Sequence, residues 1–507
     1  MVNHPPTDIT SLDDDQALDA IGGLIDLGSD LGNPATIEEA LTLVEHLRAR
    51  GLRSDREALL WYFTANAWSS LRFMRTAANR SVWEWEQPEF REEVIALRQA
   101  LHGEGFLRLN TVRRCQIPTN LGNLFSTVGR FIGAVEHYDR ALAEDARFGM
   151  ALGNKALCLT GYARALYDPG HRQVFAGMAS GLVEQAVSRP LESEAARTGF
   201  IQLAEDLRRV TNGHACSEPE HLHSYSLGEG EEATFRSWAL RERLFLNPLN
   251  DLGPFEIAAN DILHLPRMTV DFEIGTGFHG FYNQLKQEFA SARWLLFEGL
   301  QRKERHLVDR DLVLLDTLDG TAFGLSLEKL KLALRSAYSL LDKSAVFLAT
   351  YFGLKVEAEK INFRTVWYQK RHPKSGLWPL LVDRENWPLR GLFWLAKDLH
   401  EADPEYHAAI HPEAQETATL RNHLEHRYVK VLEKSSLWTP GPLPDEAPPD
   451  PFALRIERAA LEAKALRMVK TARAALVYLS LAVHAEERAK RPPDAHLVAR
   501  GELTRLE

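Results

Sequence analysis

Residues 325–354 read LSLEKLKLALRSAYSLLDKSAVFLATYFGL, and this stretch decides the fold class of the chain. Apolar side chains recur in it every three or four positions, which is the period that lines one face of an α-helix. No glycine or proline interrupts the pattern before Gly353. Similar helical patterns cover residues 282–304, 390–401, 417–434 and 454–490. Because the lengths of these segments suit a helical bundle, we expect an all-α fold with only short isolated strands.

The first half of the chain shows the same helical pattern. From about residue 37 to residue 210 apolar residues keep this spacing, with short breaks at Gly, Asp and Pro. Between Asn120 and Ala141 small and large residues follow an order that resembles a tetratricopeptide (TPR) repeat, in which small residues let two helices approach closely. A shift of about 34 residues, one TPR period, places Asn120 on Asn154 and yields a second, weaker copy. An irregular helical bundle is the alternative interpretation.

Composition and charge exclude several classes of protein. The 507 residues are 45% hydrophobic and 26% charged, as in globular chains and unlike disordered or collagen-like ones. The net charge of −10 argues against a protein whose whole surface binds nucleic acid. Residues 1–280 carry 26 Lys and Arg against 39 Asp and Glu, a balance of −13, whereas residues 281–507 carry 34 against 31, a balance of +3. We therefore expect the two halves to have different roles.

Cysteine content and the lack of export or membrane segments point to one cellular location. The three cysteines, Cys115, Cys158 and Cys216, are widely spaced and odd in number, so no disulfide framework is expected. The first 15 residues, MVNHPPTDITSLDDD, have neither the cationic start nor the apolar core of a secretion signal. No apolar run approaches the roughly 20 residues needed to cross a bilayer. We expect a cytoplasmic protein with no membrane contact.

Changes in composition divide the chain into four segments. Residues 1–34 are an N-terminal segment, and residues 35–212 are the TPR-like region. Residues 213–280 are predicted to be a connecting region with a polar loop and a short strand at RMTVDFEI. Residues 281–507 are predicted to form one helical domain. Six prolines place an extended loop at residues 436–452 of this domain.

Residues 275–280 read GTGFHG and match the GxGxxG pattern of dinucleotide-binding folds. Such folds need several alternating strands and helices, with an acidic residue closing the next strand about 20 residues further on. Here a long helical pattern follows the glycines instead. A tight turn is therefore the favoured interpretation, and no cofactor is predicted.

A second cluster of chemically active residues lies in the polar loop. Its members are His214, Cys216, His221 and His223. Four such ligands can bind zinc, but structural zinc sites usually pair their ligands from two separate turns. A solvated, histidine-rich loop is the favoured interpretation, and no metal site is predicted.

Residues 421–426 read RNHLEH inside an uninterrupted helical pattern. On an α-helix Asn422 and His426 share a face, whereas Arg421 lies about 100° round from Asn422. The planar guanidinium can hold two phosphate oxygens, and histidine titrates near neutral pH. Two such helices meeting across a two-fold axis would close a polar pocket of the size of a phosphodiester. The alternative is that Arg421 and Glu425 form an ordinary i,i+4 ion pair on a charged helix.

Three stretches resemble proteins of the HEPN superfamily, specifically the subgroup in which a TPR-like region precedes the HEPN domain. They are RLFLNPLNDLGPFEIAANDILHLP at residues 243–266, LKLALRSAYSLLDKSAVFLATYF at residues 330–352 and RNHLEHRY at residues 421–428. The resemblance implies a TPR-like helical repeat region followed by a HEPN helical bundle. It also implies a homodimer formed through the HEPN domain.

The same resemblance implies a metal-independent endoribonuclease in a toxin or anti-phage defence role. Its expected catalytic residues in this chain are Arg421 as the phosphate clamp, Asn422 as an orienting hydrogen-bond partner and His426 as the general acid and base. Such an enzyme orients the 2′-hydroxyl of RNA as the nucleophile and leaves a 2′,3′-cyclic phosphate and a 5′-hydroxyl.

The neighbours of the motif suggest how a substrate is held. Arg427, Lys430 and Lys434 are predicted to continue the motif helix and to bind RNA. The acidic TPR-like region is predicted to act as a sensor or regulator by binding a protein or peptide on its concave surface. The competing hypothesis is a non-catalytic scaffold that binds protein partners or nucleotides.

Overall fold

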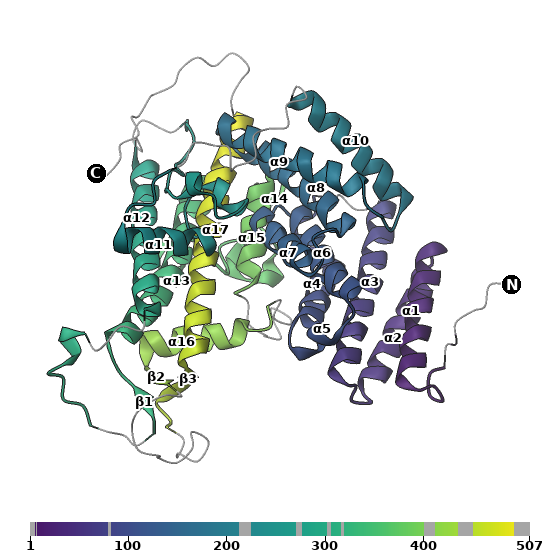
Figure 1. Ribbon diagram of the computed structural model, residues 1–507, viewed down its shortest axis with the longest axis horizontal. Coiled ribbons are helices and arrows are strands. Elements are labelled where there is room, and N and C mark those ends of the chain that lie inside the picture. The colour runs from purple at the N-terminus through teal and green to yellow at the C-terminus, as the bar shows by residue number, and fades with distance from the viewer. Residues whose placement is uncertain are drawn as a thin grey trace. The chain divides into compact units, whose positions relative to one another are not determined.

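The computed structural model describes residues 6, 8–79, 83–211, 225–269, 276–301, 306–315, 319–399, 411–433 and 450–490. These ranges contain 17 α-helices and one small sheet of three short strands, so the prediction of an all-α fold is confirmed (Figure 1). Contacts divide the chain into two compact units. The first unit consists of residues 1–218 and 382–412, and the second of residues 219–381 and 413–507.

The first unit is built from helices that pack against their neighbours in sequence. Side-chain caps begin several of them; for example, Asp13 accepts a hydrogen bond from the Gln16 N–H and Asn110 one from the Arg113 N–H. Its helices are α1 (Asp14–Asp30), α2 (Pro34–Arg48), α3 (Ser54–Asn79), α4 (Pro88–Leu101), α5 (Glu104–Arg108), α6 (Thr111–Thr127), α7 (Phe131–Glu144), α8 (Gly149–Ala165), α9 (Pro169–Val187), α10 (Glu194–Val210) and α15 (Trp387–Lys397).

Helices α6 and α7 and then α8 and α9 form the two pairs expected from the repeat pattern. A Cβ added to Gly122 would lie 2.8 Å from the Tyr138 ring, so a glycine is needed for α6 and α7 to approach this closely. Outside these pairs, a Cβ added to Gly153 of α8 would lie 2.2 Å from the ring of Phe200 in α10. Small residues therefore permit close helix packing here, as the pattern predicted. The assignment of these pairs to the TPR family stays a prediction.

Residues 382–412 belong to the first unit although the sequence analysis placed them inside a helical domain at residues 281–507. Helix α15 is buried on every side from Pro388 to Ala396. Just after it, Asp398 receives two hydrogen bonds from Arg98, at 2.7 and 3.0 Å, and one from Arg130, at 2.9 Å. Burial alone would raise the pKa of Asp398, but the two arginines hold it well below its usual range. The first unit is therefore discontinuous in sequence.

Gly129 provides a test of this packing. Its φ is +82°, and a Cβ added there would lie 2.2 Å from the Trp387 carbonyl oxygen. We expect Gly129→Ala to lower the free energy of unfolding by about 1–3 kcal/mol more than Gly51→Ala, because overpacking adds to the backbone strain. Gly51 is a matched control, since its φ is +74° and nothing lies within 4 Å. Equal losses in thermal or urea unfolding would contradict the packing of α15 in this unit.

The second unit has three long helices at its centre. Its helices are α11 (Gly230–Arg241), α12 (Gly277–Leu300), α13 (Leu325–Phe352), α16 (Ala414–His426) and α17 (Arg458–Lys490), and its strands are β1 (Thr321–Ala322), β2 (Tyr428–Leu432) and β3 (Ala453–Glu457). The 3-10 helices are η2 (Pro248–Asp251), η3 (Glu256–Ala258), η4 (Leu307–Asp309), η5 (Ala358–Lys360), η6 (Gln369–Arg371) and η7 (Pro373–Ser375). Helices α12, α13 and α17 lie side by side, and α16 crosses near one end of them (Figure 1). Helix α14 (Pro379–Val382) lies where the chain passes from this unit to the first.

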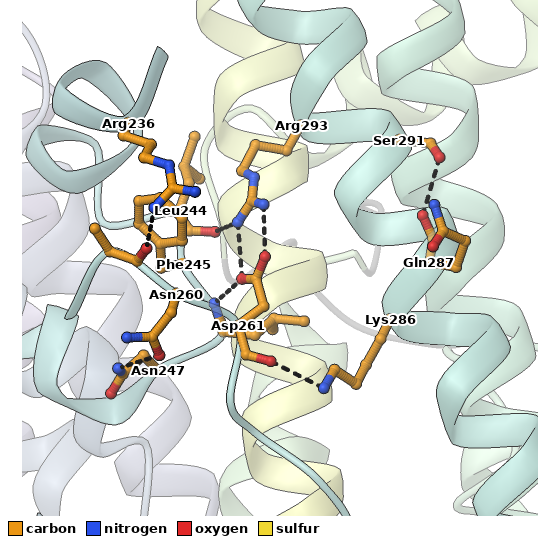
Figure 2. A network of polar contacts seen from close by, with 12 residues as sticks. Arg236, Leu244, Phe245, Asn247, Asn260, Asp261, Lys286, Gln287, Ser291 and Arg293 are labelled. Carbon is orange, nitrogen blue, oxygen red and sulfur yellow. Dashed lines mark hydrogen bonds and ion pairs between the residues drawn. The ribbon is translucent and has the colours of Figure 1, made fainter. Parts of the chain in front are cut away.

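An irregular segment, residues 243–266, packs against α12 and α17. Figure 2 shows Arg293 of α12 reaching this segment, where it donates to both carboxylate oxygens of Asp261, at 2.9 and 2.6 Å, and to the Leu244 carbonyl at 2.9 Å. Lys286 donates to the Asp261 carbonyl at 3.0 Å. Arginine side chains thus satisfy backbone groups that a regular helix or sheet would otherwise pair.

Candidate active site

Helix α16 carries the predicted motif, and its first turn is tied to α17. Glu413, the residue before the helix, forms ion pairs with Lys464 at 3.1 Å and with Arg467 at 2.7 Å. Glu416 also pairs with Lys464, at 2.7 Å. These ion pairs hold the first turn of α16 against α17. They therefore limit how far the last two turns of α16, which carry the motif, can move.

Arg421 faces α13. Its guanidinium carbon lies 5.1 Å from the centre of the Tyr338 ring, within the range of a cation–π contact. Its Nη1 donates a hydrogen bond to Asn422 Oδ1 at 3.1 Å. Although the two side chains leave the helix in different directions, the long arginine reaches its neighbour. Two of the three predicted catalytic residues are therefore brought into direct contact.

Glu425 is paired with a different arginine from the one that the alternative interpretation required. Arg335 of α13 donates from Nε and Nη2 to the two carboxylate oxygens of Glu425, each at 3.2 Å. This bidentate geometry uses both oxygens of Glu425. The structure therefore places Glu425 with Arg335, and Arg421 with Tyr338 and Asn422.

His426 is the last residue of α16, and its side chain is exposed. Asn422 is exposed one turn earlier, on the same face of the helix. Arg427 leaves the helical conformation, with φ −139° and ψ −141°, and its N–H donates to the His423 carbonyl at 3.0 Å. The imidazole of His426 is thus presented to solvent at a helix end.

The prediction that the motif helix continues to residue 434 is wrong. Tyr428–Leu432 forms strand β2, which pairs antiparallel with β1 and parallel with β3. Strand β3 covers Ala453–Glu457, and the last helix, expected within residues 454–490, runs from Arg458 to Lys490. Tyr428, Val429 and Val431 have the aromatic and β-branched side chains that favour strands. The partner strands that stabilise β2 are distant in sequence, which local helical periodicity does not reveal.

The three residues predicted to bind RNA have different surroundings. Arg427 is exposed just beyond α16. Lys430 is buried on β2, with Asp319 at 2.5 Å and Asp450 at 2.8 Å from its Nζ. Hydrogen bonds from Lys430 and Tyr428 lower the pKa of Asp450 to about 2, so this partner of the lysine stays charged near neutral pH. We therefore do not assign Lys430 to RNA binding, because its charge is neutralised within the sheet.

Lys434 lies outside the described residues. So do the cluster His214, Cys216, His221 and His223, and Gly275 of the glycine motif. The remaining residues of that motif begin helix α12.

Within the described ranges, no three His, Cys, Asp or Glu side chains are grouped so that they could hold a metal ion. In the same ranges, every helix is too short or too polar to cross a membrane.

Asp342 is a charged neighbour of the motif that the sequence analysis missed. Burial raises the pKa of its carboxyl group, while the Phe363 N–H, which donates to it at 2.9 Å, and the charges of Arg421 and Arg364 act in the opposite direction. Asp342 lies one turn beyond Tyr338 on α13. Arg335 and Asp342 are seven positions apart in the sequence and therefore lie on one face of α13. This spacing of charged residues in a largely apolar helix was the sequence signal that could have revealed Asp342.

The fold and the motif together define a mainly helical domain in which α16 ends with half-buried Arg421 and exposed Asn422 and His426. Residues 271–486 match the model of a family described as LA2681-like HEPN. A HEPN domain of the LA2681-like type therefore occupies this part of the chain, and the resemblance to HEPN proteins is confirmed. No curated protein and no solved structure matches the chain.

Proposed function

We propose that the protein is a metal-independent endoribonuclease in which Arg421, Asn422 and His426 form the catalytic group. The observation that carries this proposal is the placement of the three residues at one end of α16 inside the HEPN match. Arg421 and Asn422 are in direct contact, and His426 is exposed beside them. We further propose that it acts in the cytoplasm in a toxin or anti-phage defence role, with the first unit as its regulator.

Each residue has a distinct task in the proposed reaction. His426 takes the proton from the 2′-hydroxyl, whose oxygen then forms a bond to phosphorus. The bond from phosphorus to the 5′-oxygen breaks, and this oxygen receives a proton from an imidazolium. Arg421 neutralises the charge that develops on the phosphate oxygens, and Asn422 keeps the arginine oriented. The nucleophile belongs to the substrate, so the protein supplies only orientation, proton transfer and charge stabilisation.

A second copy of the chain completes the proposed site. One copy of the motif supplies a single His426, whereas the reaction needs a base and an acid on opposite sides of the phosphorus. A two-fold axis between two HEPN units supplies two copies of His426 and of Arg421 to one phosphate. We therefore propose that the active enzyme is a homodimer.

The direct test is cleavage of single-stranded RNA by the purified chain in the presence of EDTA. We expect products that end in a 2′,3′-cyclic phosphate and a 5′-hydroxyl, identified by mass spectrometry. The same oligonucleotide with 2′-O-methyl groups at every position should stay intact, because it lacks the nucleophile. Products with a 5′-phosphate, or cleavage of the methylated strand, would contradict the mechanism, and absence of cleavage would favour the scaffold hypothesis.

A further inference from the structure

Residues 368–377 form a short loop that is closed at its base by an antiparallel bridge, and we call it the basic hairpin. Tyr368 and Leu377 form an antiparallel bridge at its base, and the Gln369 N–H donates to the Gly376 carbonyl at 2.9 Å. Its tip carries the cationic or titratable residues Lys370, Arg371, His372 and Lys374. No acidic residue lies between the two ends. The basic hairpin is therefore a dense positive feature of the second unit.

Buried aromatic residues hold the base of the basic hairpin. Trp367 and Tyr368 are fully buried. The indole N–H of Trp367 donates to the Phe363 carbonyl at 2.8 Å, and that of Trp378 donates to the Val366 carbonyl at 3.1 Å. The second tryptophan also donates its backbone N–H to the Trp367 carbonyl at 3.1 Å. The tip is thus displayed on a fixed base, which lowers the entropy cost of binding.

The backbone at the tip is strained. Lys370 has φ +49° and Arg371 has φ +57°, and both are side-chain-bearing residues in the left-handed region. Each such residue costs about 1–2 kcal/mol, because its Cβ crowds the backbone. Glycine would avoid this cost, and the chain uses glycine at Gly376, where φ is +73°. Arg371 Nη1 donates to the Lys360 carbonyl at 3.2 Å, which helps to hold this conformation. Strained backbone at side-chain-bearing residues is concentrated at functional sites.

Asp342 connects the basic hairpin to the motif. Phe363, just before the hairpin, donates its N–H to Asp342 at 2.9 Å, and the Arg421 guanidinium lies 5.1 Å from the ring of Tyr338, one turn before Asp342 on α13. Lys370 follows Arg364 by six residues, which span at most about 20 Å of extended chain. The tip therefore lies within a few nucleotides' reach of the proposed phosphate clamp.

We propose that the basic hairpin binds the sugar–phosphate backbone of the RNA strand whose scissile phosphate is held by Arg421. This inference rests on the proposed function and adds the surface that holds the substrate. The observations that carry it are the two consecutive cations at the tip and the short chain that joins them to Phe363, which is hydrogen-bonded to Asp342, one turn from the residue that Arg421 contacts on α13. RNA is favoured over a lipid surface because residues 369–376 contain no large apolar side chain that could insert into a bilayer.

The test is a glycine double variant, Lys370→Gly with Arg371→Gly. Glycine removes both charges and keeps the left-handed backbone without strain. Binding of a fluorescein-labelled, 2′-O-methylated single-stranded RNA is measured by anisotropy over a range of salt concentrations. We expect at least a tenfold loss of affinity at low salt, and a salt-dependence slope smaller by about 1.4, or 0.7 per lost phosphate contact. The melting temperature should be unchanged or higher.

Two control variants separate binding from folding and from overall charge. Lys370→Ala with Arg371→Ala should lose as much RNA affinity as the glycine variant, because the charges are again removed. Arg310→Ala with Arg488→Ala removes two exposed charges elsewhere in the second unit and should bind RNA within twofold of the natural chain. An equal loss of affinity in this control would overturn the proposal, as would a fall in melting temperature that accounts for the loss in the glycine variant.

The remaining outcomes distinguish this inference from the proposed nuclease activity. Because the methylated probe cannot be cleaved, loss of its binding in the glycine variant supports the inference even if the natural chain cleaves nothing. A chain that cleaves RNA, but whose glycine variant binds and cleaves it as well as the natural one, would overturn the inference and leave the nuclease intact. Failure of the natural chain to bind the probe would overturn the inference. Binding to vesicles of phosphatidylcholine and phosphatidylserine is measured in parallel. The inference would also be overturned if the glycine variant lost binding to these vesicles but not to the RNA.

Discussion

Replacing His426 by alanine is expected to lower the rate of RNA cleavage by about 10²–10⁴-fold, the range typical of a lost general acid or base. The fold should survive, because the side chain is exposed at the end of α16 and supports no buried contact in the described structure. The measurement is the single-turnover rate on a labelled oligoribonucleotide, compared with the melting temperature of the same preparation.

His423 offers a matched control for this variant. It lies one turn earlier on the same helix, and its Nδ1 lies 2.9 Å from the Thr419 carbonyl. His423→Ala should therefore change the cleavage rate by no more than a few-fold. If both variants cleave RNA at the natural rate, the motif is not catalytic. If both lose activity together with thermal stability, the helix end is structural.

If the proposed site lies on a two-fold axis, RNA cleavage should be proportional to the concentration of dimer. Sedimentation velocity should show a dimer at concentrations that support cleavage, and the rate per chain should fall on dilution below the dissociation constant. Arg421→Ala should lose activity like His426→Ala, since the clamp and the proton carrier act on the same phosphate. A strictly monomeric chain with full activity would contradict the two-fold arrangement.

Helical periodicity predicted most of the fold because helices are local structures. The spacing of apolar residues within positions 325–354 is enough to indicate a helix, and α13 covers Leu325–Phe352 as expected. Strand β2 was missed because its stability depends on pairing with β1 and β3, which lie far away in the sequence. The placement of α15 in the first unit was missed for the same reason, since Asp398 finds its partners at Arg98 and Arg130.

The candidate site was predictable in part. Arg421, Asn422 and His426 could be proposed from the sequence because their spacing on a single helix is a local property. Asp342 and the basic hairpin were not, because their relation to Arg421 arises from packing between α13, α16 and the segment after α13. Lys430 shows the opposite error. Its charge looked available in the sequence, but Asp319, over 100 residues earlier, neutralises it.

Replacing Arg473 by methionine is expected to give the largest loss of stability in the second unit, about 3–5 kcal/mol, the cost of breaking a buried charge pair by removing one partner. Arg473 and Asp251 are 2% and 1% exposed, and their side chains are 2.5 Å apart. Arg473 also donates to the carbonyls of Phe245 and Asn247, at 2.6 and 3.1 Å. The variant therefore removes the bonds that Arg473 donates to a buried carboxylate and two carbonyls.

Two comparisons make the result interpretable. Arg467→Met, on the same helix, breaks a half-exposed pair with Glu413 and should cost no more than about 1 kcal/mol. Arg473→Met combined with Asp251→Leu should recover part of the loss, because no unpaired charge is left in the interior. Urea unfolding followed by tryptophan fluorescence provides the free energies. Arg473 joins α17 to the segment at residues 243–266. If Arg473→Met and Arg467→Met lowered the free energy of unfolding equally, the buried Arg473–Asp251 pair would not be what holds this segment against α17.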